Sequence, residues 1–299
     1  MFHLSFAPIQ VDIPFILDVH DYWPVCFSKD LYYKHQEVCD KQNDLKCSFC
    51  LSKKSHYPFL FFIPMLTIER YFRKKNLSNA KKIICHSQFV SNILKEHGYE
   101  NIVLPYPYIG PKRKSKNCKD NLFKILFVGR LEKKKGAHLI LDVAKQLKNK
   151  IDFRIDIIGE GPLKSILDRR DLNVYVHGFL GKNRFEYFKQ ADCLLVPSLW
   201  PEPFGMVVLE AMNFGVPTLT LKNGGIAELV KTNNVGFSLN EKEIPKKIIE
   251  ISKNFSIKKR IEKHCIENIK KYDKKIIFKK YEEIMKKVVK KCTIKNIMK

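Results

Sequence analysis

Short apolar segments alternate with helical stretches through the second half of the chain, and this alternation restricts the fold more than any other feature. The expected strands cover residues 123–128, 153–158, 173–177, 193–196 and 217–221. The helical stretches between them include residues 137–147, 183–190 and 205–214. Parallel strands are joined by right-handed helical crossovers, so the pattern predicts an α/β fold with a doubly wound parallel sheet. Ligands of such sheets bind beyond the carboxyl ends of the strands.

Glycines and cations follow the first two expected strands. Gly129 and Arg130 come directly after the first strand, Lys135 and Gly136 end the same turn, and Gly159 follows the second strand. A strand-to-helix turn with two cations is suited to holding a diphosphate, because both side chains can donate charge-assisted hydrogen bonds. The turn is therefore a candidate phosphate site.

Two carboxylates lie eight residues apart around an expected helix start. Glu202 lies in the approach loop, Gly205 opens the helix, and Glu210 is expected about two turns into it. Amide groups at a helix N-terminus attract phosphate, and a carboxylate can accept hydrogen bonds from sugar hydroxyls. The segment thus predicts a binding site for a nucleotide sugar.

The chain does not match the spacing of other nucleotide-binding motifs. Gly159-Glu-Gly161 lacks the third glycine of a dinucleotide-binding loop because Lys164 stands there, and the chain has no Gly-x4-Gly-Lys-Ser/Thr run. It has no Asp-x-Asp pair that could chelate a metal on a diphosphate. Cationic side chains and helix N-termini would have to stabilise the diphosphate instead.

These motifs together resemble the donor domain of family-4 retaining glycosyltransferases of the GT-B fold. The resemblance is dense over residues 123–240 and looser over residues 14–87. It rests on Glu202-x7-Glu210, the Gly129-Arg130 to Lys135-Gly136 loop, Gly159-Glu-Gly161-Pro162 and Gly224-Gly225-Ile-Ala-Glu228. It implies two Rossmann-like domains with doubly wound parallel sheets. By comparison with the family, roughly 80 residues of the N-terminal domain are expected to be missing.

The resemblance also implies roles for individual residues. Arg130 and Lys135 match the diphosphate clamp, Glu202 matches the carboxylate that faces the donor sugar, and Glu210 matches the one that binds the ribose. His20, Glu202, Arg130 and Lys135 are then the expected catalytic residues. The expected donor-binding residues are Gly129, Arg130, Lys135, Gly159, Phe204, Gly205, Met206, Val207 and Glu210.

The implied reaction moves a sugar with retention from a UDP or GDP sugar to a glycan or lipid-linked acceptor, in the synthesis of cell-envelope polysaccharide or glycoconjugate. No cofactor is expected to be required for catalysis. The alternative is a non-catalytic donor-binding partner or a truncated remnant of such an enzyme, and a further chain could supply the missing N-terminal segment.

His20 ends an expected strand that emerges as Asp18-Val-His-Asp-Tyr-Trp23. It matches the histidine of the family's acceptor domain, which sits near the bond that is broken. A structural histidine that caps a strand is the alternative.

Four cysteines follow this strand with the spacing C-x12-C-x7-C-x2-C. The spacing of two of them is typical of thiolates on one tetrahedral zinc ion, and the other two could complete the site. A structural zinc, free buried thiols and a redox role all stay open. The residues are Cys26, Cys39, Cys47 and Cys50, in a stretch that is expected to form a loop up to about Lys54.

The formal net charge is +24, and residues 241–299 hold 20 Lys/Arg against 8 Asp/Glu. A solvated basic helix surface and attraction to an anionic membrane both explain this charge, whereas nucleic acid is disfavoured because no nucleic-acid module accompanies it. The apolar run at residues 59–66 is too short to span a bilayer, and no signal peptide is evident. We expect a cytoplasmic protein, with peripheral binding to the inner face of the membrane as an alternative.

Four segments follow from these arguments. Residues 1–111 form a partial acceptor-side domain, residues 112–122 a linker, residues 123–272 the donor-binding domain, and residues 273–299 a basic C-terminal helix.

Overall fold

The computed structural model describes residues 13–33, 37–39, 43–55, 57–113 and 122–297. Most of the linker expected at residues 112–122 lies outside this set. Backbone contacts divide the chain into two compact units, one formed by Met1–Pro107 with Lys274–Lys299 and the other by Tyr108–Asp273.

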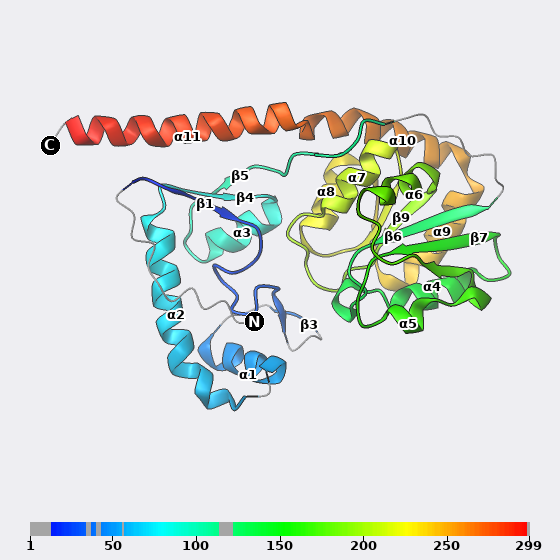
Figure 1. Ribbon diagram of the computed structural model, residues 1–299, viewed down its shortest axis with the longest axis horizontal. Coiled ribbons are helices and arrows are strands. Elements are labelled where there is room, and N and C mark those ends of the chain that lie inside the picture. Colours follow the sequence, from blue (N-terminus) through cyan, green and yellow to red (C-terminus); the bar gives the residue numbers. More distant parts are fainter. Residues whose placement is uncertain (1–12, 34–36, 40–42, 56, 114–121, 298–299) are drawn as a thin grey trace. The chain divides into compact units, whose positions relative to one another are not determined.

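The second unit contains a six-stranded sheet in which every pairing is parallel (Figure 1). The strand order β11-β10-β9-β6-β7-β8 places the first strand in the middle and winds outward in both directions. This confirms the doubly wound sheet, with β11 as a strand that the sequence pattern did not predict. The strands are β6 (Phe123–Val128), β7 (Phe153–Ile158), β8 (Val174–Val176), β9 (Cys193–Val196), β10 (Thr218–Leu221) and β11 (Gly236–Leu239).

Helices follow the strands and bury the apolar sheet. They are α4 (Leu139–Leu147), α5 (Lys164–Leu167), α6 (Arg184–Gln190), α7 (Met206–Phe214), α8 (Gly224–Asn233), α9 (Ile244–Lys253) and α10 (Phe255–Ile269). Ile140 of α4 and Ile248 of α9 pack with Ile125 and Ile155 in one core, where all four are fully buried. Burying each such side chain stabilises the fold by about 1.5–3 kcal/mol before the cost in entropy.

The first unit contains a smaller parallel sheet of the order β1-β4-β5. Its strands are β1 (Ile16–Val19), β4 (Lys82–Cys85) and β5 (Ile102–Val103), and a separate antiparallel pair is formed by β2 (Tyr32–Tyr33) and β3 (Glu37–Val38). Its helices are α1 (Asp44–Ser55), α2 (Phe59–Asn79), α3 (Gln88–Glu96) and α11 (Lys274–Ile297).

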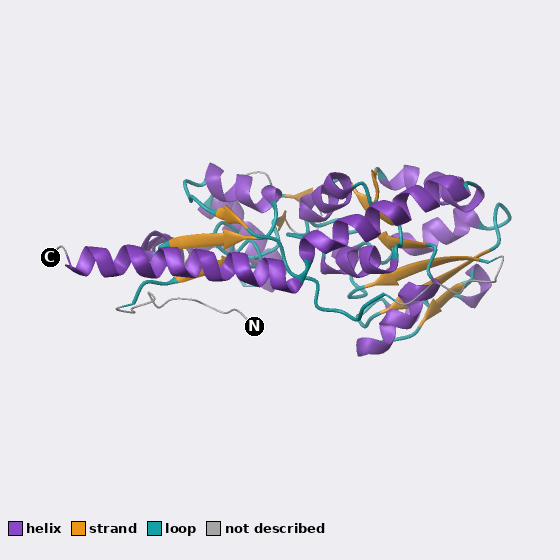
Figure 2. Ribbon diagram, turned by 90° about the horizontal axis from the view of Figure 1, so that it is seen from above, coloured by secondary structure: helices purple, strands orange, loops and turns teal. Residues whose placement is uncertain are grey.

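Helix α11, at the C-terminal end of the chain, packs on this small sheet. Ile277 is fully buried against Ile84 of β4 and against Leu104. Figure 2 shows α11 running alongside the strands of its unit. The basic segment expected at residues 273–299 therefore contributes an apolar side chain to a core.

The cysteine-rich stretch before Lys54 was expected to be a loop, but residues 44–55 form helix α1. Cys47 and Leu51, one turn apart, pack with Phe62 and Leu66 of α2. A short polar helix is marginal by itself, so tertiary packing explains why the local pattern gave no signal. Among the described helices, none is both long enough and apolar enough to cross a bilayer.

Candidate functional site

The loops after β6 and β9 meet at the carboxyl edge of the large sheet. Lys133–Lys135 form a short 3₁₀ turn after β6, which ends at Gly136. Leu199 and Trp200 from the loop after β9 donate backbone hydrogen bonds to the carbonyl of Lys134, at 2.9 and 3.2 Å. Neighbouring parallel strands end at the same edge, so these two loops are held side by side.

Lys135 and Glu202 form an ion pair across these loops. The distance from Lys135 Nζ to Glu202 Oε1 is 3.0 Å, and the side chains are only 18% and 12% exposed. Ser198 donates its hydroxyl proton to the same carboxylate oxygen. The Lys135 ammonium also lies 5.1 Å from the centre of the Trp200 ring. A cation and a carboxylate predicted from separate motifs are thus brought into direct contact.

The Gly224-Gly225 pair explains how the Glu202 loop is held. The amide of Gly225 donates to the carbonyl of Glu202 at 2.7 Å, and the Asn223 side chain donates to the carbonyl of Leu199 at 2.9 Å. Gly224 has φ +71°, and a Cβ atom there would lie 2.6 Å from the Glu202 nitrogen. Only glycine permits this approach of two backbones.

The N-terminus of α7 follows Glu202 closely. Gly205 is its N-cap with φ +107°, Met206 is 40% exposed and Val207 is half-buried. The first amide groups of a helix have no intrahelical acceptor, so this terminus can donate to an anion. Phe204 is 3% exposed and packs edge-on against Tyr272, and this buried contact anchors the loop.

Glu210 is the fifth residue of α7, just over one turn into the helix and not two turns as expected. Arg184, the first residue of α6, donates two hydrogen bonds to its carboxylate, at 2.6 and 3.1 Å. This bidentate pair raises the pKa of the Arg184 guanidinium. The Glu210 side chain is 14% exposed. Sequence reasoning missed Arg184, because no motif connects two residues that meet only through packing of α6 against α7.

Arg130 lies at the start of the same β6 loop but is more exposed. Its guanidinium Nη1 lies 3.0 Å from Glu132 Oε1, and its side chain is 58% exposed. Gly129 donates its amide proton to the carbonyl of Ile158 at 3.0 Å, and a Cβ atom on Gly159 would lie 1.8 Å from the Gly129 oxygen. These two glycines therefore let the ends of β6 and β7 approach one another.

His20 follows β1 in the first unit. Its Nδ1 atom is hydrogen-bonded to the Tyr106 hydroxyl, and its ring stacks on His86 with 5.0 Å between the centres. The side chain is 60% exposed, so one side of the ring faces solvent.

Comparisons with known proteins identify the family. The profile of the family described as Glycosyl transferases group 1 matches residues 109–272, which is more than half of the chain. The chain belongs to the glycosyl transferases group 1 family. The matched region includes Arg130, Lys135, Glu202 and Glu210, whereas His20 and the four cysteines lie outside it.

Several relatives resemble this group 1 chain over most of its length. An uncharacterized glycosyltransferase of Methanocaldococcus jannaschii is 31% identical over 220 residues, which cover 71% of this chain and 60% of the relative. A 41.2 kDa protein in the cps region of Klebsiella pneumoniae is 25% identical over 251 residues, covering 79% and 61%. The chain therefore spans about 60% of the length of these two curated relatives.

A solved structure confirms the fold. Anabaena HepE in complex with UDP superposes with a TM-score of 0.67 at 17% identity, covering 92% of this chain and 72% of that one. The fold of the group 1 chain is thus the expected GT-B type.

The four predicted zinc ligands of this group 1 chain line one small cavity. Cys26, Cys47 and Cys50 are buried, Cys39 is partly exposed, and the cavity between them measures about 20 Å³. Burial, together with the neighbouring thiols, raises the pKa of the Cys47 thiol to about 12. Cys26, Cys39, Cys47 and Cys50 form no disulfide. A cavity of this size can hold a single ion.

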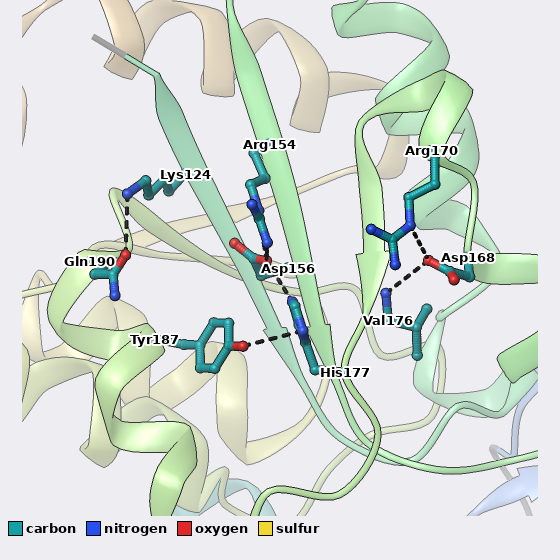
Figure 3. A network of polar contacts seen from close by, with 9 residues as sticks. All are labelled: Lys124, Arg154, Asp156, Asp168, Arg170, Val176, His177, Tyr187 and Gln190. Atoms are coloured by element: carbon teal, nitrogen blue, oxygen red, sulfur yellow. Dashed lines mark hydrogen bonds and ion pairs between the residues drawn. The ribbon is translucent and has the colours of Figure 1, made fainter. Parts of the chain in front are cut away.

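A second polar network, which the sequence did not predict, lies on the large sheet of the second unit (Figure 3). Asp156 of β7 accepts hydrogen bonds from Arg154 at 2.9 Å and from His177 Nε2 at 2.7 Å, and Tyr187 of α6 is bonded to His177 Nδ1 at 3.2 Å. Both ring nitrogens of His177 therefore have partners, as expected of a structural network that joins strands to a helix.

Proposed function

We propose that this chain is a family-4 glycosyltransferase that moves a sugar from a nucleotide diphosphate to a glycan or lipid-linked acceptor with retention of configuration. The product belongs to a cell-envelope polysaccharide or glycoconjugate in this proposal. The observation that carries it is the 3.0 Å contact between Lys135 and Glu202 at the carboxyl edge of the large sheet. That edge is where ligands of doubly wound sheets bind.

The diphosphate is held by charge in this proposal. Lys135 has three ammonium protons, so it can keep its bond to Glu202 and still donate to a phosphate oxygen. Arg130 is exposed on the same loop, and the amide groups of Gly205, Met206 and Val207 at the start of α7 add further donors. These groups offer positive charge without a metal ion, which is why none is proposed for donor binding.

Glu210 is proposed to bind the ribose. Its carboxylate is already fixed by two hydrogen bonds from Arg184, and a carboxylate with two oxygens retains further acceptor sites for hydroxyl groups. The position on α7 places this carboxylate one helical turn beyond the amides that would bind phosphate.

Bond cleavage is assisted by the same residues. The bond between the sugar carbon and the phosphate oxygen breaks, and the electron pair leaves with the diphosphate. Arg130 and Lys135 stabilise the negative charge that develops on it, which lowers the barrier because the interaction strengthens in the transition state. Glu202 faces the donor sugar, and His20 supports the positive charge on it from the acceptor side.

UDP is the first probe for the test, because HepE was solved with it. We expect the double variant R130A/K135A to bind UDP at least about 10-fold more weakly by calorimetry, since each lost charged hydrogen bond costs about 1.5–3 kcal/mol. K145A is the matched control, because Lys145 is an exposed cation on α4 outside the loop. GDP is titrated in parallel.

Transfer is measured separately with labelled nucleotide sugars and membrane lipid extracts as acceptors. E202Q should retain UDP affinity within a few-fold and lose transfer. Unchanged UDP and GDP affinity in R130A/K135A would contradict the donor site. Normal donor binding without transfer would favour the non-catalytic donor-binding partner instead.

A further inference from the structure

Three side chains that can bind metals lie together at the carboxyl edge of the small sheet. His20 directly follows β1, and His86 directly follows β4. The register pairs Val19 with Cys85, so the next residues, the two histidines, are also neighbours. Asp18 lies two residues before His20 and therefore on the same face of the sheet.

Two ligand atoms in this cluster, one from His86 and one from Asp18, face each other at close range. His86 is 2% exposed, and its Nδ1 atom lies 2.8 Å from the carbonyl oxygen of Leu104. A carbonyl only accepts, so Nδ1 carries the proton and Nε2 of the neutral ring has a lone pair. Nε2 lies 2.8 Å from Asp18 Oδ1. Both atoms are buried, and neither makes a hydrogen bond within the described part of the chain.

The remaining polar atoms of the three side chains already have partners. Tyr281 of α11 donates to Asp18 Oδ2 at 2.9 Å, and the Tyr106 hydroxyl is bonded to His20 Nδ1. The Leu104 carbonyl is the corresponding partner of His86. Each of the three side chains thus has one polar atom held by a hydrogen bond outside the cluster and one polar atom that faces the other two side chains. Metal-binding histidines and carboxylates are typically oriented in this way by a second set of hydrogen bonds.

We propose that Asp18, His20 and His86 bind a divalent transition-metal ion, with Zn²⁺ as the representative. Two imidazoles and one carboxylate form a ligand set that suits such ions. The ligand atoms all lie within 4.8 Å of one another. Bonds of about 2.0–2.1 Å to a tetrahedral ion would place them roughly 3.3 Å apart, which a small movement of the exposed His20 side chain achieves. The exposed side leaves a fourth position for water or another oxygen ligand.

The three ligands belong to the first unit, whereas Arg130, Lys135, Glu202 and Glu210 belong to the second. The competing occupant of the gap is a proton on His86 Nε2, which would convert the pair with Asp18 into a simple ion pair. Metal binding distinguishes the two.

The test uses the full chain, freed of metal with a chelator and titrated with Co²⁺ and then with Zn²⁺. Cobalt on nitrogen and oxygen ligands gives weak visible bands, whereas cobalt on thiolates adds intense near-ultraviolet absorption. The C47S/C50S variant removes the thiolate signal and leaves the Asp18 site in view. We expect about one equivalent of cobalt to bind to this variant and to be displaced by zinc.

Four further variants, one of them a control, are made in the C47S/C50S background. H20A and D18N should each weaken cobalt binding by more than 10-fold, and Y106F should weaken it about 10- to 100-fold through the orientation of His20. H97A is the control, because His97 is another exposed histidine of the same unit. His20 is exposed, so H20A is expected to fold normally. The absence of bound cobalt in C47S/C50S, or equal affinity in H20A, D18N and H97A, would overturn the proposal.

Discussion

Glu210 has a largely buried carboxylate whose charge is balanced by Arg184. Removing the guanidinium would leave that charge unpaired, so we expect R184A to lower the free energy of unfolding by about 1–3 kcal/mol. R184K should recover part of this loss, because an ammonium group cannot reproduce the bidentate geometry. Urea denaturation measures both, with K145A as the exposed control. Equal stability of R184A and K145A would show that the pair contributes nothing.

Asp18 predicts a pH dependence of stability in the first unit. Burial opposes its ionisation, but the close contact with His86 and the hydrogen bond from Tyr281 hold its pKa below the ordinary value of 3.8. A carboxyl with a lowered pKa in the folded state stabilises that state above its ordinary pKa, and the contribution is lost as the pH falls toward the folded value.

D18N should therefore lose stability at neutral pH and lose less than the wild type on acidification. Urea denaturation midpoints of D18N and the wild type, measured at several pH values between about 3 and 7, test this difference in pH dependence. Parallel pH profiles for the two proteins would contradict the prediction.

Individual site residues were predictable where a motif fixed their position along the chain. Glu202 and Lys135 were predicted from separate loops, and the structure places them in contact. Ser198, which donates to Glu202, and Arg184, which donates to Glu210, were not predictable, because these contacts are defined by where loops and helices pack and not by spacing. The same holds for His86, which has no sequence signal until β1 and β4 are paired in register.

At the level of elements, the loops of the large sheet depend on close backbone contacts. Gly159 has φ +151°, and its Cβ would lie 1.8 Å from the Gly129 oxygen, whereas Gly181 has φ +51° with nothing within 4 Å of its Cβ. An alanine at either position would have a strained backbone, but only at Gly159 would its Cβ also clash with another backbone segment. We expect G159A to be several kcal/mol less stable than the wild type and G181A to lose only about 1–2 kcal/mol.

Urea denaturation of the two variants checks this difference within one unit. UDP affinity should fall in G159A as well, because Gly129 and the following Arg130 would be displaced. Equal stability of G159A and G181A would mean that the ends of β6 and β7 can separate freely.

Helix α1 carries the predicted zinc ligands Cys47 and Cys50 one turn apart. Zinc binds thiolates, and the pKa of the buried Cys47 thiol is near 12 without metal, so binding should release protons and depend strongly on pH. We expect protein purified without chelator to hold about one zinc per chain, and C47S to lose it. Elemental analysis measures the content. Zinc at background level would contradict the zinc site.

For the whole molecule, the alternation of strands and helices predicted the large sheet, because each crossover helix packs its apolar face against the strands. The packing of α11 was not predictable, because its lysine pairs dominate the pattern and Ile277 gives no sign of which sheet it meets. A long-range contact of this kind is decided by the fold and not by local periodicity.

The net charge of +24 and the surface of α2 together predict peripheral binding to anionic membranes. Leu60 and Phe61 are 64% and 61% exposed on this helix, and Lys74 and Lys75 are exposed near its end. Exposed apolar side chains insert at the interface, while lysines are attracted to anionic headgroups. We expect the protein to float with phosphatidylserine vesicles, to stay behind with neutral ones, and to bind less as salt screens the attraction.

L60S/F61S should reduce flotation several-fold at every salt concentration, because it removes the contribution that salt does not screen. I166S is the matched control, since Ile166 is an exposed apolar residue of the other unit at 52% exposure. Wild-type protein that stays at the bottom of a low-salt gradient with anionic vesicles would contradict membrane binding. Flotation of L60S/F61S equal to that of I166S would assign the attraction to charge alone and exclude α2 as the inserted surface.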